Sequence, residues 1–289
     1  MAARPPTLPA ALSPVLVGLG VAIGEGTFEP GPALGCIAVA LLLQVAANLA
    51  NDLFDFRSGA DTADRLGPPR AAATGLLSER DLAVGVAVVL GLAGLVGLGL
   101  VLVGGPIILA LGILAVLSAL AYTGGPWPYG YHGLGEVFVF IFFGLVAVAG
   151  TAYLQTGTWT LLAYAAAIPM GAIITGILVV NNLRDLATDR AAAKHTLATR
   201  IGAPATELEF VALLAVAYAV PVGIALAGAA GPAVVLPLLS LLMAVPLVRR
   251  VRAGGDPRRL NAVLRGTARL SLAFGVLFAI GLAIGGRIL

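Results

Sequence analysis

Long stretches of apolar residues dominate the chain, and they limit the folds that are open to it. Of its 289 residues, 60% are hydrophobic and only 11% are charged, which is far more apolar than a soluble domain of this length requires. Several stretches approach or exceed the roughly 20 residues that an α-helix needs to cross a bilayer. They are continuously apolar and do not alternate, which argues against a β-barrel. The sequence therefore predicts an all-α polytopic membrane protein, with residues 1–289 forming a single transmembrane domain.

We expect about nine transmembrane helices from these stretches. Their expected ranges are 11–28, 32–53, 82–103, 105–123, 134–154, 159–182, 207–228, 231–249 and 266–286, and the glycine-rich run 82–123 also permits other divisions. Several prolines near the start, and the lack of a convincing cleavage site, favour a retained first helix over a signal peptide.

Lys and Arg are concentrated in alternate connections between the expected helices. They occur in 54–80, 183–205 and 249–265, whereas the connections after the first, third, fifth and seventh helices contain none. The positive-inside rule then predicts that the N-terminus and the polar loops 54–80 and 183–205 are cytoplasmic and that the C-terminus lies outside. Because the net charge of +3 is mostly this topological signal, it gives no reason to expect a nucleic-acid partner.

Two polar stretches follow long apolar runs and carry carboxylates at helical spacing. On a helix, residues at i, i+4 and i+7 or i+8 share one face. Two triplets have this spacing: Asn48, Asp52 and Asp55 in the first stretch, and Asn181, Asp185 and Asp189 in the second. An ionised aspartate deep in lipid costs roughly 2.5 kcal/mol or more, so carboxylates at the ends of membrane helices need a reason. A divalent cation shared with a phosphorylated substrate is the simplest one.

Basic residues follow both stretches in the order that a metal–diphosphate site needs. Arg65 and Arg70 come after the first, and Arg190 and Lys194 after the second. Such cations could neutralise the phosphate charge that the metal leaves uncompensated, although topology alone also predicts basic residues here.

An aromatic turn runs from Tyr122 through Tyr129 to Glu136 and is rich in Gly and Pro. It is either part of an aromatic belt at the membrane interface or a cap on the mouth of the site.

The two carboxylate motifs resemble the paired Asp-rich motifs of the UbiA superfamily of intramembrane prenyltransferases. The first motif reads Asn51-Asp52-x-x-Asp55, and the second reads Asp185-x-x-x-Asp189. The stretches 48–70, 4–9, 128–135 and 181–196 are more narrowly similar to the menaquinone branch of the superfamily, the 1,4-dihydroxy-2-naphthoate polyprenyltransferases. Beyond residue 202 the similarity is mainly one of hydropathy.

Two departures from the superfamily pattern stand out. Many members place a third acid four residues after Asp55, where this chain has Gly59 and carries Asp61 instead; that displacement is typical of the menaquinone branch. The turn after Tyr122 usually carries a basic residue, but here it reads Gly-Gly-Pro126-Trp127-Pro.

The resemblance implies about nine helices around a central cavity in the bacterial cytoplasmic (inner) membrane. The implied reaction transfers a polyprenyl group from polyprenyl diphosphate to 1,4-dihydroxy-2-naphthoate with loss of carbon dioxide, giving demethylmenaquinone, and it needs Mg²⁺. The implied metal ligands are Asp52, Asp55, Asp61, Asp185 and Asp189. The implied diphosphate contacts are Arg65, Arg70, Lys194 and Arg190. Three amides, Asn48, Asn51 and Asn181, would orient carboxylates or contact a metal-bound water, and the tyrosines Tyr122 and Tyr129 would contact substrate.

Two other functions stay open at this point. Another UbiA-type aromatic prenyltransferase would share the metal site and differ in its acceptor pocket. A transporter could also use repeated helices with carboxylates along a substrate path, but it would place the acids deeper in the membrane and would not need phosphate-binding bases beside them.

Overall fold

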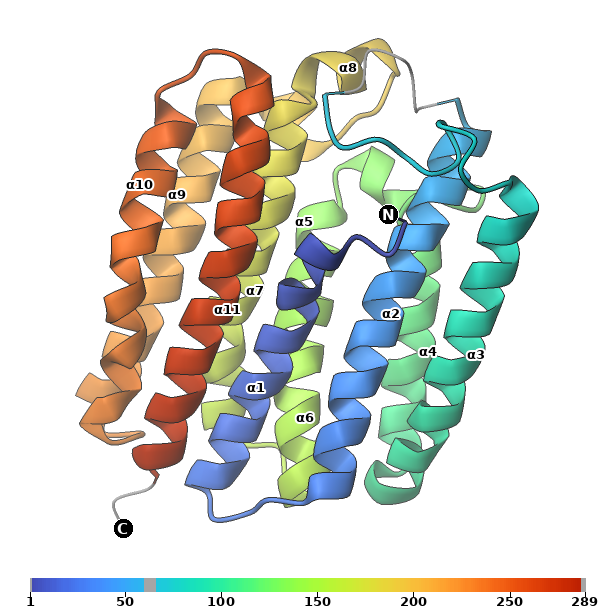
Figure 1. Cartoon of the computed structure of the whole chain (residues 1–289). Helices are drawn as coiled ribbons and strands as arrows, with labels where there is room; N and C mark the ends of the chain where they lie inside the picture. Colours follow the sequence, from blue (N-terminus) through green and yellow to red (C-terminus); the bar gives the residue numbers. More distant parts are fainter. Residues whose placement is uncertain (1, 60–65, 287–289) are drawn as a thin grey trace.

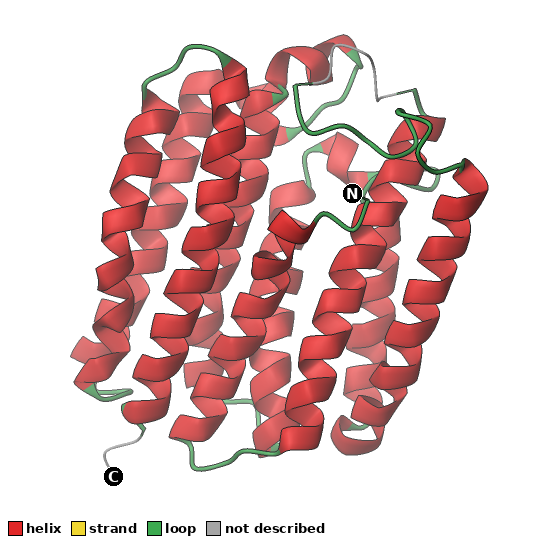
Figure 2. Cartoon of the chain, in the orientation of Figure 1, coloured by secondary structure: helices red, strands yellow, loops and turns green. Residues whose placement is uncertain are grey.

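The computed structural model describes residues 2–59 and 66–286, and the described chain is a bundle of long helices that stand side by side (Figure 1). The described residues contain no strand (Figure 2). The long elements are α1 (Leu8–Gly24), α2 (Pro30–Arg57), α3 (Glu79–Gly104), α4 (Pro106–Ala121), α5 (Gly135–Val139) continued by the π-helical η3 (Phe140–Val146) and α6 (Ala147–Thr156), α7 (Leu161–Arg184), α9 (Leu197–Leu226), η4 (Pro232–Ser240) continued by α10 (Leu241–Arg252), and α11 (Leu260–Ile284). The short elements are η1 (Pro5–Thr7), η2 (Tyr129–His132), α8 (Leu186–Ala191) and η5 (Pro257–Arg259).

The helices agree in number with the prediction of about nine crossings. Within the described residues, 8 helices are long and apolar enough to span a membrane, and α4 adds a shorter apolar helix of 16 residues. Long apolar helices satisfy their own backbone hydrogen bonds, which is the condition for crossing lipid. The chain is therefore a multi-span membrane protein.

Helix ends differ from the expected ranges at three places that bear on the site. α2 continues to Arg57, because no residue disfavours the helix before Gly59, which has a φ of 68°. Asp55 therefore lies on the helix and not in the loop 54–80. α9 begins at Leu197, inside the expected loop 183–205, and is kinked at Gly202 (φ 80°, ψ 168°). Likewise, α11 begins at Leu260, six residues before the expected start at 266.

Small residues let the helices of the bundle approach one another closely, as in other membrane proteins. α1 packs against α11, so the first and last helices of the chain are neighbours (Figure 1). A Cβ atom at Gly20 of α1 would lie 2.5 Å from the Cα atom of Ala279 in α11. α7 contacts α1, α9, α11 and η3 and so holds the centre of the bundle, whereas α3 packs mainly on α2 and α4.

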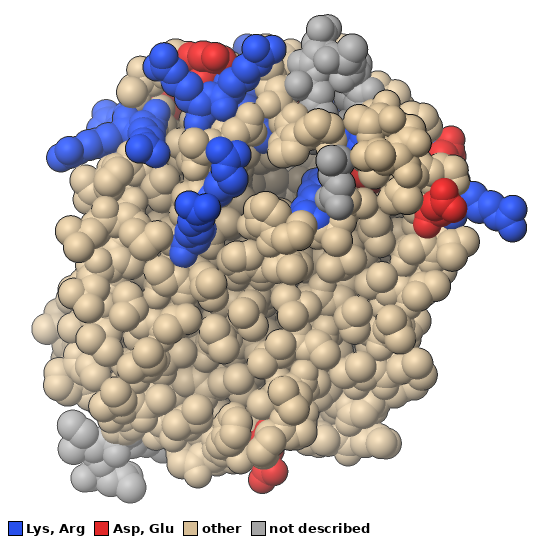
Figure 3. Space-filling model, viewed as in Figure 1, with Lys and Arg blue, Asp and Glu red and all other residues tan. Residues whose placement is uncertain are grey.

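The ends of α2 and α7 reach the same end of the bundle, where α8 and the loop 66–77 also lie (Figure 1). Lys and Arg side chains gather at this end of the face shown in Figure 3, and no Lys or Arg side chain is visible on the side of the bundle below them. The charge pattern of the sequence thus corresponds to a spatial pattern, and both Asp motifs lie at the basic end.

Candidate active site

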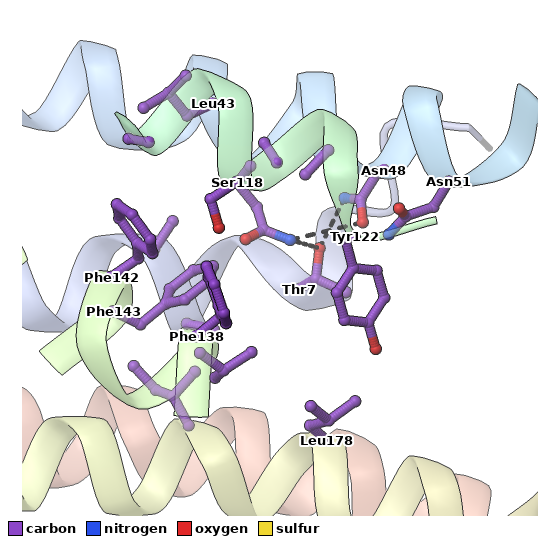
Figure 4. A pocket seen from close by; sticks show the side chains of 18 of the residues that line it. Thr7, Leu43, Asn48, Asn51, Ser118, Tyr122, Phe138, Phe142, Phe143 and Leu178 are labelled. Atoms are coloured by element: carbon purple, nitrogen blue, oxygen red, sulfur yellow. Dashed lines mark hydrogen bonds between the residues drawn. The ribbon is translucent and has the colours of Figure 1, made fainter. Parts of the chain in front are cut away.

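One cavity of about 1390 Å³ runs from the basic end of the bundle into its apolar interior. This volume exceeds the 300–1,000 Å³ or so of an ordinary small-molecule pocket. Polar residues of both Asp motifs line one end. Apolar residues of α1, α2, α3, α4, the α5–α6 segment, α7 and α11 line the rest. Figure 4 shows Phe138, Phe142 and Phe143 in the same pocket as Asn51 and Tyr122. The shape suits a ligand with a charged head and a long apolar tail.

Asp55 is the carboxylate of the first motif that lines the cavity, and cations surround it. It is 4% exposed, and its Oδ2 accepts a hydrogen bond of 2.5 Å from Arg70 Nη2. Its Oδ1 accepts one of 2.5 Å from the Tyr131 hydroxyl and lies 3.7 Å from Lys194 Nζ. That ammonium also lies 4.3 Å from the centre of the Tyr131 ring. The structure therefore brings Arg70 and Lys194, both expected diphosphate contacts, to one carboxylate.

Asp52 does not line the cavity, although its spacing puts it close to the face of Asp55. It is 1% exposed, and its Oδ2 accepts a hydrogen bond of 2.9 Å from the backbone N–H of Ala71. Its Oδ1 is buried and has no hydrogen-bond partner among the described residues. The loop 66–77 returns over the end of α2 and covers this carboxylate, which a helical pattern alone does not reveal.

The two asparagines of the first motif line the cavity, and protein groups engage both side chains. Asn48 Nδ2 donates to the Ala3 carbonyl (3.0 Å) and to Thr7 Oγ1 (2.9 Å), a contact visible in Figure 4. Asn51 Oδ1 accepts from Thr123 Oγ1 (2.9 Å). Asn48 thus anchors the N-terminal segment, a role that the sequence did not suggest.

In the second motif, Asp185 is held by its own neighbour in the chain. Arg184 Nε donates to Asp185 Oδ1 (2.7 Å), and Arg184 Nη2 donates to Asp185 Oδ2 (2.5 Å). The same Nη2 donates to Asn181 Oδ1 (2.9 Å), so all three residues share one network.

Asp189 lies on α8 and lines the cavity, and no side-chain hydrogen bond reaches its carboxylate in the described part of the chain. Its pKa is raised from 3.8 to about 6, chiefly by burial. The charge of Lys194 opposes the rise, and the carboxylates of Asp185 and Asp55 add to it. The carboxyl thus lies among other acids in an environment that favours a bound cation.

Arg190 lies apart from the cavity, against the expectation that it contacts diphosphate. It is exposed, and its Nη2 donates to the Thr199 carbonyl (3.4 Å). The short helix α8 turns Asp189 inward and the adjacent Arg190 outward, because successive residues of a helix point about 100° apart. Two expected site residues, Asp61 and Arg65, lie outside the described residues.

Tyr122 and Tyr129 both line the cavity and are held in place by neighbouring groups. The Tyr129 hydroxyl bonds with Ser118 (2.9 Å), and its ring stacks on Phe138 with centroids 4.1 Å apart. Burial, together with the charge of Glu136, raises the pKa of Tyr122 well above its usual value. Burial also raises the pKa of Tyr129 to about 12, and the Ser118 hydrogen bond opposes this rise. Both therefore stay neutral at physiological pH and offer aromatic faces.

Some polar residues of the site did not stand out in the sequence. Tyr131 contacts Asp55, and Asn182 Nδ2 donates to the buried Glu136 (2.9 Å). Asn261, on α11, accepts from Arg184 Nη1 (2.8 Å) and donates to the Leu66 carbonyl (2.9 Å). Arg184 itself was assigned only to topology. Arg184 and Asn182 could have been found from the sequence, because they adjoin the second motif. Tyr131 and Asn261 could not, because they are distant in sequence from their partners Asp55 and Arg184.

The donor set fits Mg²⁺ held together with a phosphate. No group of three His, Cys, Asp or Glu residues within ranges 2–59 and 66–286 is arranged to hold a metal by itself. Mg²⁺ usually binds through one or two carboxylates plus substrate phosphates. The cavity carboxylates Asp55, Asp185 and Asp189 all line its polar end. In the same helix as Asp55, the buried Asp52 Oδ1 has no hydrogen-bond partner among the described residues. Carboxylate oxygens are the hard ligands that suit Mg²⁺.

Comparison with known proteins decides the family. A family model described as the UbiA prenyltransferase family matches residues 11–273. The chain belongs to the UbiA prenyltransferase family. The 1,4-dihydroxy-2-naphthoate octaprenyltransferase of Mycobacterium tuberculosis is 40% identical over 283 residues, covering 98% of this chain and 96% of the relative. The enzyme of the same name from Haemophilus influenzae is 36% identical to this chain. The match covers 98% of this chain and 94% of that enzyme.

Solved UbiA structures share the fold. A UbiA homolog from Aeropyrum pernix K1 superposes with a TM-score of 0.73 at 17% identity, covering 95% of this chain and 97% of the homolog. A UbiA homolog from Archaeoglobus fulgidus, bound to DMAPP and Mg²⁺, gives a TM-score of 0.66 at 14% identity. The superposition covers 96% of this chain and 98% of the homolog. These likenesses confirm the predicted fold class of a UbiA-type helical bundle around a cavity.

Proposed function

We propose that this chain transfers a polyprenyl group from polyprenyl diphosphate to 1,4-dihydroxy-2-naphthoate, with loss of carbon dioxide, giving demethylmenaquinone. The observation that carries the proposal is a cavity whose carboxylate-and-cation end continues into a long apolar interior. This shape matches a diphosphate joined to an isoprenoid chain. The names of the relatives from Mycobacterium tuberculosis and Haemophilus influenzae support both the donor and the acceptor.

The polar end would bind the diphosphate between carboxylates and cations. Mg²⁺ would be held by the carboxylates that line the cavity, Asp55, Asp185 and Asp189. The Archaeoglobus fulgidus homolog bound to DMAPP and Mg²⁺ supports this choice of metal. When bound, the ion supplies positive charge that stabilises the leaving diphosphate. Arg70 and Lys194 would neutralise phosphate oxygens that carry more charge as the C–O bond breaks. They would also take the place of the basic residue that is missing from the turn after Tyr122.

The apolar part would hold the isoprenoid and exclude water from the developing allylic cation. Phe138, Phe142 and Tyr129 line this part of the cavity and offer neutral aromatic faces to positive charge. Water exclusion matters because water would compete with the aromatic acceptor for the cation. Asp52 would act indirectly, by holding the loop 66–77 through Ala71 so that Arg70 stays beside Asp55.

The location that accompanies this proposal is the bacterial cytoplasmic membrane, with the polar end of the cavity on the cytoplasmic side. The positions of the Lys and Arg residues support this orientation. A water-soluble acceptor and a membrane-bound isoprenoid donor could then meet at one site.

The test is a transfer assay with purified protein in lipid vesicles. Radiolabelled polyprenyl diphosphate is offered with 1,4-dihydroxy-2-naphthoate, with the corresponding naphthalenediol that lacks the carboxylate, or with a hydroxybenzoate. We expect label in a naphthoquinol product with release of carbon dioxide, and loss of turnover when EDTA removes divalent metal. Transfer to the hydroxybenzoate alone would identify a different UbiA-type prenyltransferase, and full turnover in EDTA would exclude the metal.

A further inference from the structure

Arg184 is a buried cation of the site whose guanidinium nitrogens are all hydrogen-bonded, although neither its spacing nor the proposed function gives it a role. It is 2% exposed, ends α7, and lines the cavity. All three guanidinium nitrogens donate hydrogen bonds: Nε and Nη2 to the two oxygens of Asp185, Nη2 also to Asn181, and Nη1 to Asn261.

The fork between Arg184 and Asp185 occupies the oxygens that a metal ion would need. Both carboxylate oxygens accept from the guanidinium, at 2.7 Å and 2.5 Å. A metal ion at Asp185 would repel the adjacent positive charge and would weaken the hydrogen bonds that the same two oxygens accept. A buried guanidinium that loses its carboxylate pays a large desolvation cost unless another anion replaces it. A phosphate group is such an anion, since the planar guanidinium fork fits two phosphate oxygens as well as two carboxylate oxygens.

We propose that Arg184 is a diphosphate-binding residue that holds Asp185 until the substrate arrives. When metal and diphosphate bind together, Asp185 turns to the metal and Arg184 Nε and Nη2 turn to the diphosphate. Neither ligand alone satisfies both partners of the ion pair, so the two ligands bind cooperatively at this motif. The inference rests on the proposed function, which supplies the metal and the diphosphate.

Asn261 gives the guanidinium a fixed point for this exchange. Its Oδ1 accepts from Arg184 Nη1, the nitrogen that does not contact Asp185, and its Nδ2 donates to the Leu66 carbonyl. The guanidinium can therefore release Asp185 and stay anchored to α11.

The first motif has a parallel arrangement, because the cavity-lining Asp55 is paired with Arg70 at 2.5 Å. Each motif thus pairs one of its cavity-lining carboxylates with an arginine that could bind phosphate instead. The pairing at Arg184 differs in that the guanidinium and the carboxylate belong to adjacent residues.

The experiment measures Mn²⁺ bound to the full chain in detergent by equilibrium dialysis at a fixed free Mn²⁺ concentration, with and without inorganic diphosphate. In the wild type we expect diphosphate to strengthen Mn²⁺ binding by about tenfold or more, within the usual range of coupling between two ligands. In Arg184→Gln, we expect Mn²⁺ alone to bind more tightly than in the wild type and the strengthening by diphosphate to fall below about threefold. The control is Arg190→Gln, which removes an exposed cation six residues along the same segment and should behave as the wild type.

A second variant keeps the test decisive if Arg184→Gln does not fold. In Asp185→Asn, the guanidinium is released from its carboxylate, so inorganic diphosphate measured in EDTA should bind more tightly than to the wild type, even though Mn²⁺ binding weakens. Equal weakening of Mn²⁺ and diphosphate binding in both variants would mean that the pair only stabilises the fold, and unchanged coupling in Arg184→Gln would overturn the exchange. If diphosphate does not strengthen Mn²⁺ binding even in the wild type, the proposed metal–diphosphate site fails, and the inference fails with it.

Discussion

At the scale of single residues, position and not charge separates the basic side chains that follow the second motif. Lys194 lines the cavity, lies 3.7 Å from Asp55 and covers the Tyr131 ring. Arg190, four residues earlier, is exposed and contacts only the Thr199 carbonyl among the bonds that the described residues make. The two cations satisfy the positive-inside rule equally well, so any difference between them in catalysis must come from the cavity.

We therefore predict that Lys194→Ala lowers kcat/KM for the prenyl diphosphate by at least roughly tenfold, since loss of one positioned group at a developing charge commonly costs this much or more. Arg190→Ala should stay within about twofold of the wild type, as expected of an exposed surface cation. Both are measured in vesicles at equal amounts of inserted protein. Similar small losses in the two variants would mean that Lys194 serves orientation alone.

The candidate site could be predicted from sequence as far as local spacing reaches. The motifs identified Asp55, Asp185, Asp189, Arg70 and Lys194, and all five line the polar end of the cavity. The sequence could not show that the Ala71 N–H donates a hydrogen bond to Asp52, because that contact depends on how the loop 66–77 returns over α2.

It could not show that Asn261 reaches Arg184 either, because 77 residues separate the two in the chain. Such contacts come from the tertiary fold, about which helical periodicity carries no information.

At the scale of helices, glycine spacing explains why the bundle closes on itself. α1 and α11 come from opposite ends of the chain, and Gly20 allows their backbones to touch. Hydropathy predicted both helices but gave no reason to place them side by side, because any apolar helix is stable in lipid. The pairing follows from the small residues that face each other, which is the main way membrane helices gain packing energy.

Gly20→Ala should lower the thermal stability of the purified protein, because the new Cβ would lie 2.5 Å from Ala279 Cα and 2.6 Å from its carbonyl oxygen. Overpacking of this kind costs about 1–3 kcal/mol. The matched control is Gly91→Ala in α3, where nothing lies within 4 Å of the added Cβ, so any gain from helix propensity appears there alone. The measurement is the temperature at which half of the detergent-solubilised protein is lost. Equal temperatures for the two variants would refute the close packing of α1 on α11.

At the scale of the whole molecule, the lengths of the apolar stretches predicted the fold class, and the positions of Lys and Arg in the sequence predicted where the site lies. Long, continuously apolar segments cross lipid as helices, because a helix satisfies its own backbone hydrogen bonds. Both Asp motifs were expected at the end of the bundle that carries the Lys and Arg residues. The structure places α8, the loop 66–77 and the ends of α2 and α7 at that end. Hydropathy and spacing did not reveal the cavity, because its walls are apolar residues that lipid-facing helices also carry; only the resemblance to the UbiA superfamily predicted it.

The orientation of this whole arrangement in the membrane is the remaining consequence of the charge pattern. The basic end should face the cytoplasm, because Lys and Arg are retained on that side during insertion. We predict that, after Cys36→Ala, a single cysteine at Thr158 is labelled in intact cells by a membrane-impermeant maleimide and one at Ala192 is not. Both positions are exposed and lie at opposite ends of the bundle, so accessibility within the fold does not distinguish them.

Ala192→Cys should react once the cells are permeabilised, which shows that the thiol is present and free. Labelling of Ala192→Cys in intact cells, with Thr158→Cys protected, would reverse the topology and place the Asp motifs outside. A diphosphate substrate made in the cytoplasm could not then reach them directly, and the proposed reaction would lose its supply of donor.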